Sequence, residues 1–196
     1  MVCQRTSTTR FAAQSPGNPV PTHRVPFMTI RPTLAQDLPL LPDLERSAAQ
    51  AFRQYPALAW LADSDVMDEA ENARFQTVGG SWVAVDERDH PLGFICAAVV
   101  GDNLHIHELS VCQQAQGQGL GRQLLDQAIQ TARAAGLHAV TLTTFAEVPW
   151  NGPFYARLGF KVLAAGHLDD RLAAILAEER AHGLEGRCAM RLPLGI

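Results

Sequence analysis

Two histidines lie two residues apart in the segment Leu104–Val111, which we expect to form a β-strand. Side chains two apart in a strand project from one face, so His105 and His107 are predicted to lie together. Imidazole titrates near neutral pH, which makes such a pair a candidate for moving protons in catalysis. The pair could instead be a packed and hydrogen-bonded core feature, or half of a metal site for which no third ligand stands out.

Glu108, the next residue, is the second candidate for proton transfer. In a regular strand its carboxylate faces the side opposite the histidines, together with Ile106 and Ser110. A β-bulge would reverse that parity. We therefore hold Glu108 in reserve as the base.

A glycine-rich run, Gln-Gly-Gln-Gly-Leu-Gly-Arg, covers residues 116–122 between a predicted strand and a predicted long helix. Glycines let the backbone approach a ligand closely, and the first amides of a helix have no partners within it. Together with the helix dipole, these amides favour an anion such as a phosphate. The dinucleotide fingerprint is missing because Leu124 stands at its third glycine, and the Lys-Ser/Thr of a Walker loop is missing too.

The elements that position these residues form a mixed α/β pattern. Strands are predicted at Phe27–Arg31, Ser81–Val85, Pro91–Val100, Leu104–Val111, Ala139–Phe145, Phe160–Ala164 and Arg187–Leu192. Helices are predicted at Ala35–Phe52 with a kink or break at Pro42, once or twice within Tyr55–Val78, and at Gly119–Ala135, Pro149–Leu158 and Asp169–His182. This pattern predicts one domain over residues 27–196.

Bulk composition narrows the class of protein. The chain has 196 residues and a net charge of -4, which argues against binding nucleic acid. It has no apolar run near the length of about 18 residues that a membrane span needs. The four cysteines contain no Cys-x-x-Cys pair, so we expect reduced thiols in a cytoplasmic protein.

Residues 1–26 differ from the rest in composition. They hold four prolines, three arginines and no acidic residue, which predicts a disordered tail. An acid-poor start of this kind is also typical of an organellar transit peptide, although the prolines weigh against one. A third reading is that translation begins at Met28.

The glycine-rich run, with Val111 five residues before Gln116, resembles the acetyl-CoA pyrophosphate loop of the GCN5-related N-acetyltransferases (GNAT). The segment Val148–Phe160, with Tyr155 and a closing Leu-Gly-Phe, resembles the later motif of the same family. One helix, one strand and one short helix separate the two motifs, as in the family. The resemblance covers about residues 28–193 and is loose over 35–78.

This resemblance implies the GNAT fold, a mixed and mostly antiparallel sheet of about seven strands with helices on both faces. Two central strands would splay apart at the acetyl-CoA site, where Leu109, Ser110 and Val111 would meet the pantetheine arm. The pyrophosphate would be held by Gln116, Gly117, Gln118, Gly119, Leu120, Gly121 and Arg122. Asn151 is a further candidate for coenzyme A contact, although it lies nearer Tyr155 than the usual asparagine of the family.

The His-x-His pair also resembles that of the arylalkylamine N-acetyltransferases. By that likeness His105 and His107 would pass the proton of the amine out through water, and Tyr155 would protonate the departing thiolate. Tyr155 could instead be an ordinary core aromatic.

The sequence therefore predicts an acetyl-CoA-dependent N-acetyltransferase that acts on a primary amine, most readily a small one, by direct attack. Phe52, Tyr55 and Trp60 offer aromatic surface for an apolar acceptor. The alternatives are a protein N-terminal or lysine acetyltransferase and a non-catalytic acyl-CoA sensor. No metal is expected, and the chain is expected to be a monomer or homodimer.

Overall fold

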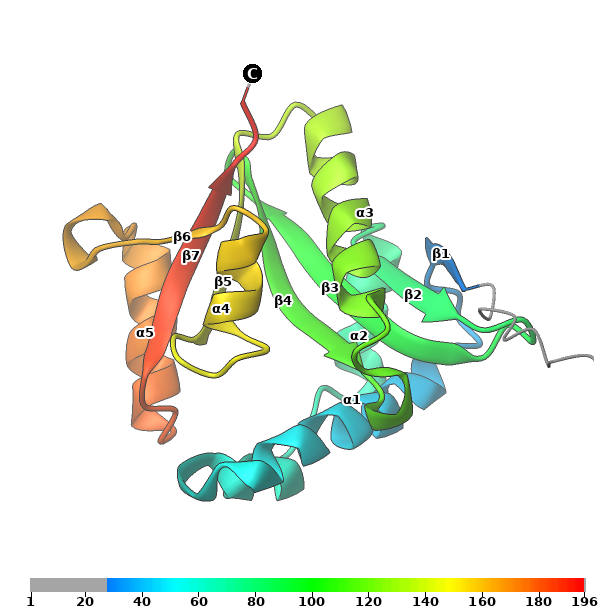
Figure 1. Ribbon diagram of the computed structural model, residues 1–196. Helices are drawn as coiled ribbons and strands as arrows, with labels where there is room; N and C mark the ends of the chain where they lie inside the picture. Colours follow the sequence, from blue (N-terminus) through cyan, green and yellow to red (C-terminus); the bar gives the residue numbers. More distant parts are fainter. Residues whose placement is uncertain (1–27, 196) are drawn as a thin grey trace, which may run out of the picture.

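The computed structural model describes residues 28–195. The tail predicted over residues 1–26 and the first residue of the first predicted strand, Phe27, lie outside the described residues. The described chain contains one seven-stranded sheet (Figure 1). Its strands are β1 (Thr29–Pro32), β2 (Ser81–Val85), β3 (Pro91–Val100), β4 (Asn103–Val111), β5 (Ala139–Phe145), β6 (Lys161–Val162) and β7 (Arg187–Pro193).

The strands follow the order β1-β2-β3-β4-β5-β7-β6. Every neighbouring pair is antiparallel except β4 and β5, which run parallel. Strands β2, β3 and β4 form a meander joined by tight turns, whereas α1 and α2 lie between β1 and β2. The long helix α3 crosses over between the two parallel strands, as a parallel connection requires. The predicted mixed, mostly antiparallel sheet is confirmed.

The α-helices are α1 (Leu41–Ala49), α2 (Glu69–Thr77), α3 (Leu120–Ala134), α4 (Gly152–Arg157) and α5 (Asp170–Ala181). Short 3-10 turns are η1 (Leu38–Leu40), η2 (Gln50–Gln54), η3 (Pro56–Asp63), η4 (Gln113–Ala115) and η5 (Ala165–His167). The helix predicted over residues 35–52 is thus three segments. Pro42 does not kink a helix: it lies in the first turn of α1, where its missing N–H would have no partner anyway.

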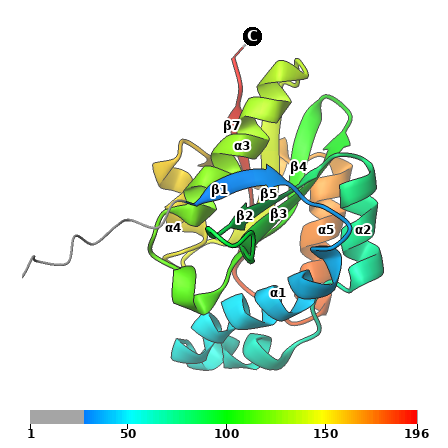
Figure 2. The ribbon, with the colours of Figure 1, turned by 90° about the vertical axis from the view of Figure 1, so that its right-hand side faces the viewer.

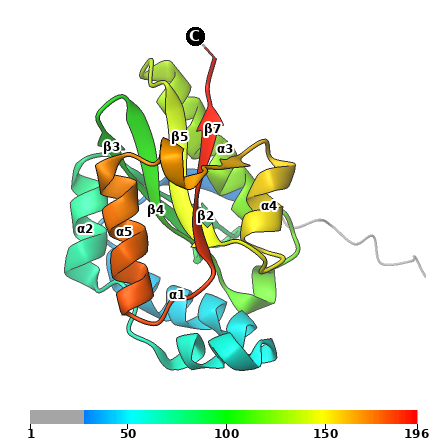
Figure 3. The ribbon, with the colours of Figure 1, turned by 90° about the vertical axis from the view of Figure 1, so that its left-hand side faces the viewer.

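Helices cover both faces of the sheet (Figures 2 and 3). α3 and α4 lie on one face, and the apolar stripe of α3 packs into the main core with Ile95, Ile106 and Val140. α1, α2 and α5 lie on the other face, where the buried leucines of α1 pack against Val83 and Phe94. The sheet is therefore a rigid layer, and the loops at its ends are free to build a site.

The two parallel strands separate soon after they meet. β4 pairs with β5 at only three positions, from Asn103 opposite Ala139 to His105 opposite Thr141. Beyond these pairs both strands continue, to Val111 and Phe145, without bonding to each other, and the gap between them is visible in Figure 1. The splay expected at a central pair of strands is confirmed.

Candidate active site

A cavity of about 760 Å³ lies at the gap between the diverging strands. Residues 106–111 of β4 form one side and residues 142–145 of β5 form the other. The glycine-rich loop and α4 close one end, while α1, η2 and η3 approach the other end. Most residues that the sequence singled out meet in this cavity, although they come from separate elements.

The glycine-rich loop has the geometry of an anion-binding turn. Gly117 and Gly119 have positive φ of 75° and 84°, and Gly119 is the N-cap of α3. A Cβ added at either position would meet no atom within 4 Å, so the loop leaves open space beside its backbone. Gln116 donates from Nε2 to the carbonyl of Val111 at 3.0 Å and thereby ties the loop to the end of β4.

Asn151 lies across the gap, directly before α4. Its Oδ1 is buried and has no hydrogen-bond partner among the described residues, while its Nδ2 makes a long bond of 3.5 Å to the Trp150 carbonyl. A buried acceptor without a donor is costly, which favours a ligand N–H at this position. The open glycine loop, the edge of β4 that β5 leaves unpaired and the unpartnered oxygen of Asn151 lie along one cavity. Together they fit an elongated ligand that carries a phosphate at one end and amide groups along its length.

A β-bulge at His107 changes which face of β4 each side chain occupies. Cys96 of β3 stands opposite Glu108, but the next residue, Ala97, stands opposite Ile106, so His107 has no partner. The prediction for a regular strand, in which Glu108 shares a face with Ile106 and points away from His105, is therefore wrong. The extra residue places Glu108 on the face of α1 and α2, and Ile106 on the opposite face in the main core.

The carboxylate of Glu108 lines the cavity and accepts a hydrogen bond of 2.7 Å from the hydroxyl of Ser110. Burial raises the pKa of this carboxyl, while the hydrogen bond from Ser110 and the charge of Arg187 oppose that rise. A carboxylate of raised proton affinity beside a cavity can take a proton from a ligand.

The two histidines occupy different surroundings. Their rings touch at a centroid distance of 4.9 Å, as the sequence predicted for neighbours on one face. His107 lines the cavity and packs on Phe75 at 4.8 Å. His105 does not line it: the ring is buried and shares a hydrogen bond of 3.0 Å with Thr141. Burial lowers the pKa of His105 to about 3 and also lowers that of His107.

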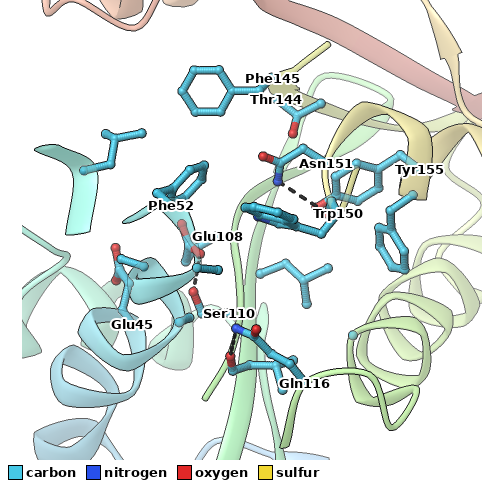
Figure 4. A pocket seen from close by; sticks show the side chains of 18 of the residues that line it. Glu45, Phe52, Glu108, Ser110, Gln116, Thr144, Phe145, Trp150, Asn151 and Tyr155 are labelled. Carbon is cyan, nitrogen blue, oxygen red and sulfur yellow. Dashed lines mark hydrogen bonds between the residues drawn. The ribbon is translucent and has the colours of Figure 1, made fainter. Parts of the chain in front are cut away.

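Tyr155 comes from α4 and faces the cavity from the side opposite β4 (Figure 4). Its ring packs edge-on against Phe154 and Phe160, so it belongs to the core as well as to the cavity wall. Burial raises the pKa of its hydroxyl, and the charge of Glu108 adds to the rise. The hydroxyl therefore keeps its proton at neutral pH, which is the protonation state that a proton donor needs.

Glu45 of α1 is a second carboxylate in the cavity, on the same side as Glu108 (Figure 4). One of its oxygens accepts the backbone N–H of Met67 at 3.3 Å. Burial, and then the charge of Glu108, raises its pKa to about 8. Sequence reasoning did not find this residue, although Glu45 follows the buried Leu41 by one helical turn and thus falls on the inward stripe of α1.

Aromatic side chains and an ion pair form the remaining wall. Phe52 of η2 packs edge-on against Phe145 and Trp150 at 5.7 and 5.6 Å, and all three line the cavity. Tyr55 contacts Trp150 from behind, and Trp60 is exposed, so neither reaches the cavity as the sequence had suggested. Arg187 lies over the ring of Phe145 and bonds Glu179 at 2.6 Å.

A family model described as "Acetyltransferase (GNAT) family" matches residues 43–160, more than half of the chain. The chain belongs to the GNAT acetyltransferase family. The match includes both β4 and β5, the glycine-rich loop and α4, so most of the residues that line the cavity lie in the matched part of the chain. The suspected family is confirmed.

Two curated proteins share sequence identity with about half of this GNAT chain. A peptidyl-lysine N-acetyltransferase, YjaB of Salmonella typhimurium, is 32% identical over 89 residues, which are 45% of this chain and 55% of that protein. The chain thus spans about half the length of the curated relatives it matches.

Two solved structures share the GNAT fold at low sequence identity. N-acetylglutamate synthase from Neisseria gonorrhoeae, with coenzyme A and N-acetyl-glutamate, has a TM-score of 0.64 at 18% identity, over 87% of this chain and 36% of that one. PaiA N-acetyltransferase from Thermoplasma acidophilum, with coenzyme A, has a TM-score of 0.63 at 16% identity, over 85% and 99%. The likeness to the arylalkylamine enzymes stays a prediction, since none of these findings bears on it.

Between residues 28 and 195, no helix has the length and apolar character needed to cross a membrane. Within the same range, no three side chains of His, Cys, Asp or Glu converge in a way that would hold a metal ion.

Proposed function

We propose that the chain transfers the acetyl group of acetyl-CoA directly to a primary amine, with Glu108 as the proton acceptor and Tyr155 as the proton donor. The observation that supports this most is the placement of Glu108 and Tyr155 on opposite sides of one cavity, at the gap where β4 and β5 separate. A thioester held along this gap would lie between a base and an acid.

The cofactor half of the proposal uses backbone groups. The amides at the start of α3, with Gly117 and Gly119, would bind the pyrophosphate, and Arg122 lies in the same part of the cavity wall. The backbone of Leu109 and Val111, which no strand pairs on the β5 side, would meet the pantetheine arm. The orphan Oδ1 of Asn151 would accept one of its amide N–H groups.

The chemical step needs a neutral amine, because an ammonium has no lone pair to attack with. Glu108 takes a proton from the ammonium, and the freed nitrogen attacks the thioester carbonyl. As the carbon–sulfur bond breaks, the thiolate leaves with the proton of the Tyr155 hydroxyl. The nitrogen loses its second proton to solvent, the tyrosine oxygen takes one back from solvent, and Glu108 releases its proton before the next turnover. His107 lines the same cavity and offers an alternative route for protons, whereas His105 lies outside the lining.

The acceptor half fits a primary amine on an apolar stem. Phe52 and Trp150 provide aromatic surface, and Glu45 and Glu108 provide the negative charge that favours an ammonium. Both small amines and the side chain of lysine have this form. A peptidyl-lysine acceptor is the second candidate because the curated relatives carry that activity in their names.

The test is a panel of small alkylamines, arylalkylamines and lysine-containing peptides incubated with acetyl-CoA. Release of free thiol measures turnover, and mass spectrometry of the acceptor shows whether the acetyl group was transferred. We expect acetylation of at least one primary amine. Tight acetyl-CoA binding with no acceptor modified would instead favour a sensor, and the absence of acetyl-CoA binding would refute the proposal.

A further inference from the structure

Glu45 has no part in the proposed chemistry, although it lies in the same cavity as the base. α1 packs against β4 and so holds the side chain of Glu45 close to Glu108. No basic side chain in the described range 28–195 forms an ion pair with either carboxylate. Two half-buried carboxylates without a counter-ion are an expensive arrangement unless a cation from outside the chain uses it.

The hydrogen bonds of the pair leave part of each carboxylate free. The bonds from Met67 N–H and from the Ser110 hydroxyl each occupy one oxygen, Oε2 of Glu45 and Oε1 of Glu108. An ionised carboxylate can accept about four hydrogen bonds, so each group keeps capacity toward the cavity. An ammonium, with three N–H donors, is the ligand that such a pair suits best.

Charges from every neighbouring element act on this pair. Glu71 of α2 adds negative charge beside Glu45, and Arg46, the next residue of α1, opposes it only weakly from the exposed side of that helix. Arg187 of β7 acts on Glu108 from across the gap but is already bonded to Glu179. The sum is a negative pocket with a high affinity for a proton or for another small cation.

We propose that Glu45 is a positioning residue of the acceptor site, which pairs with Glu108 to select aliphatic amines in their ammonium form and to strengthen Glu108 as a base. This inference rests on the proposed function and adds a substrate class to it. Aliphatic amines are protonated at neutral pH, while aryl amines of the aniline type are neutral. The pair therefore favours the first class, which includes the lysine side chain.

Like charge explains the second part of the role. The two carboxyls are close enough that ionisation of either one disfavours ionisation of the other, so the pair holds a proton more tightly than Glu108 would alone. When the ammonium N–H bond breaks, the proton passes to a Glu108 oxygen, and the repulsion within the pair falls. Glu45 thus acts on the reacting nitrogen through Glu108 and through the field of the pocket.

The decisive experiment compares wild-type protein with Glu45→Gln, using one aliphatic amine that the wild type acetylates and one aniline-type amine. We expect kcat/KM for the aliphatic amine to fall about tenfold in the variant, and that for the neutral amine to change less than twofold, as for loss of a charged neighbour. The acidic limb of the kcat/KM profile should move to lower pH by about one unit, because Glu108 no longer shares a proton with a second carboxyl.

Two variants control this experiment. Asp43→Asn removes a carboxylate from the same helix at an exposed site, where the side chain is 87% accessible. It should leave unchanged both the ratio of kcat/KM between the two amines and the acidic limb of the kcat/KM profile. Glu45→Asp keeps the carboxylate and should retain the wild-type limb, even where the shorter side chain lowers the rate. Acetyl-CoA affinity, measured by calorimetry, reports whether each variant is folded.

The outcomes separate the two proposals. If the wild type acetylates no amine, the proposed function fails. If the wild type is active but Glu45→Gln keeps both its amine preference and its pH limb, the role of Glu45 is refuted while the function stands. A variant that loses both amine classes equally would assign Glu45 a purely structural role and would also refute the inference.

Discussion

The two halves of the cavity are built from different parts of the chain and by different means. The proposed cofactor half consists mainly of backbone groups from one stretch of sequence, the end of β4, the glycine-rich loop and the start of α3. The side chain of Asn151 is its main contribution from another part of the chain. The acceptor half consists of side chains from distant elements, including Glu45 of α1, Phe52 of η2, Trp150 before α4 and Arg187 of β7.

The difference explains what each half can recognise. Backbone amides read only charge and shape, so the cofactor half suits a ligand that is the same for every member of the family. Side chains read chemical identity, and they can be exchanged one at a time without disturbing the sheet. We therefore expect substitutions in the cofactor half to act on acetyl-CoA affinity, and substitutions in the acceptor half to act on turnover and amine preference.

The largest expected effect is on turnover, from Glu108→Gln. Loss of the base should lower kcat by about 10²–10⁴-fold, with acetyl-CoA affinity nearly unchanged, as measured by steady-state kinetics and calorimetry. The matched comparison is the double variant His105→Ala, His107→Ala, which should lose less because His105 lies outside the cavity lining. If the double variant is the more damaged of the two, the imidazoles carry the proton and Glu108 does not.

Tyr155→Phe should have the next largest effect, about a hundredfold on kcat, at the lower end of the range for a general acid. The substitution keeps the edge-on packing against Phe154 and Phe160, so stability should change little. A thiolate leaving group of low proton affinity depends less on this acid, so an acyl donor with such a group should recover part of the rate. Full activity of Tyr155→Phe with acetyl-CoA would show that the thiolate takes its proton from water.

Gly119→Glu tests the cofactor half, and we expect acetyl-CoA affinity to fall at least tenfold because a negative side chain enters an anion site. Gly136→Glu is a matched control at the opposite end of α3, where φ is also positive, at 69°, and the surrounding space is also open. Both variants pay a similar cost of backbone strain. Equal affinities by calorimetry would mean that the loop does not bind the pyrophosphate.

The sequence predicted the position of the glycine-rich loop between a strand and a long helix well, because the determinants of that loop are local. Three glycines, a strand before them and an amphipathic helix after them specify the loop within about twenty residues, and the sheet that holds the loop follows from the same periodicities. The helix at residues 35–52 was predicted less well, because Pro42 is disruptive inside a helix and harmless in its first turn.

The acceptor half was harder to predict because it depends on register and on tertiary packing. One extra residue at His107 moves Glu108 to the other face of β4. No residue type near this position predicts the bulge. Burial of His105 against Thr141 follows from the pairing of β4 with β5, which are 36 residues apart. Glu45 did leave a signal, as an acidic residue on the buried stripe of an amphipathic helix.

The smallest expected effect is the change in folding stability when the half-buried carboxyl of Glu45 is removed from the acceptor half. The pKa of Glu45 is raised to about 8, above its value of about 4.3 in an unfolded chain, so the folded protein favours the protonated form. Its contribution to stability is complete below the unfolded pKa and is lost as the pH rises through the folded pKa. Removing the carboxyl should therefore help most at high pH.

Urea unfolding of the wild type and Glu45→Gln between pH 5 and pH 8 measures this term. The free energy of unfolding of the variant, relative to the wild type, should rise by on the order of 1 kcal/mol over that range. Relief of Glu108, whose pKa is also raised, acts in the same direction. Asp43→Asn is the matched control, because it removes an exposed carboxyl from the same helix. If the free energy of unfolding of Glu45→Gln instead changes with pH in the same way as that of the wild type, the two carboxylates do not destabilise the folded protein. No cation would then be needed to compensate for them.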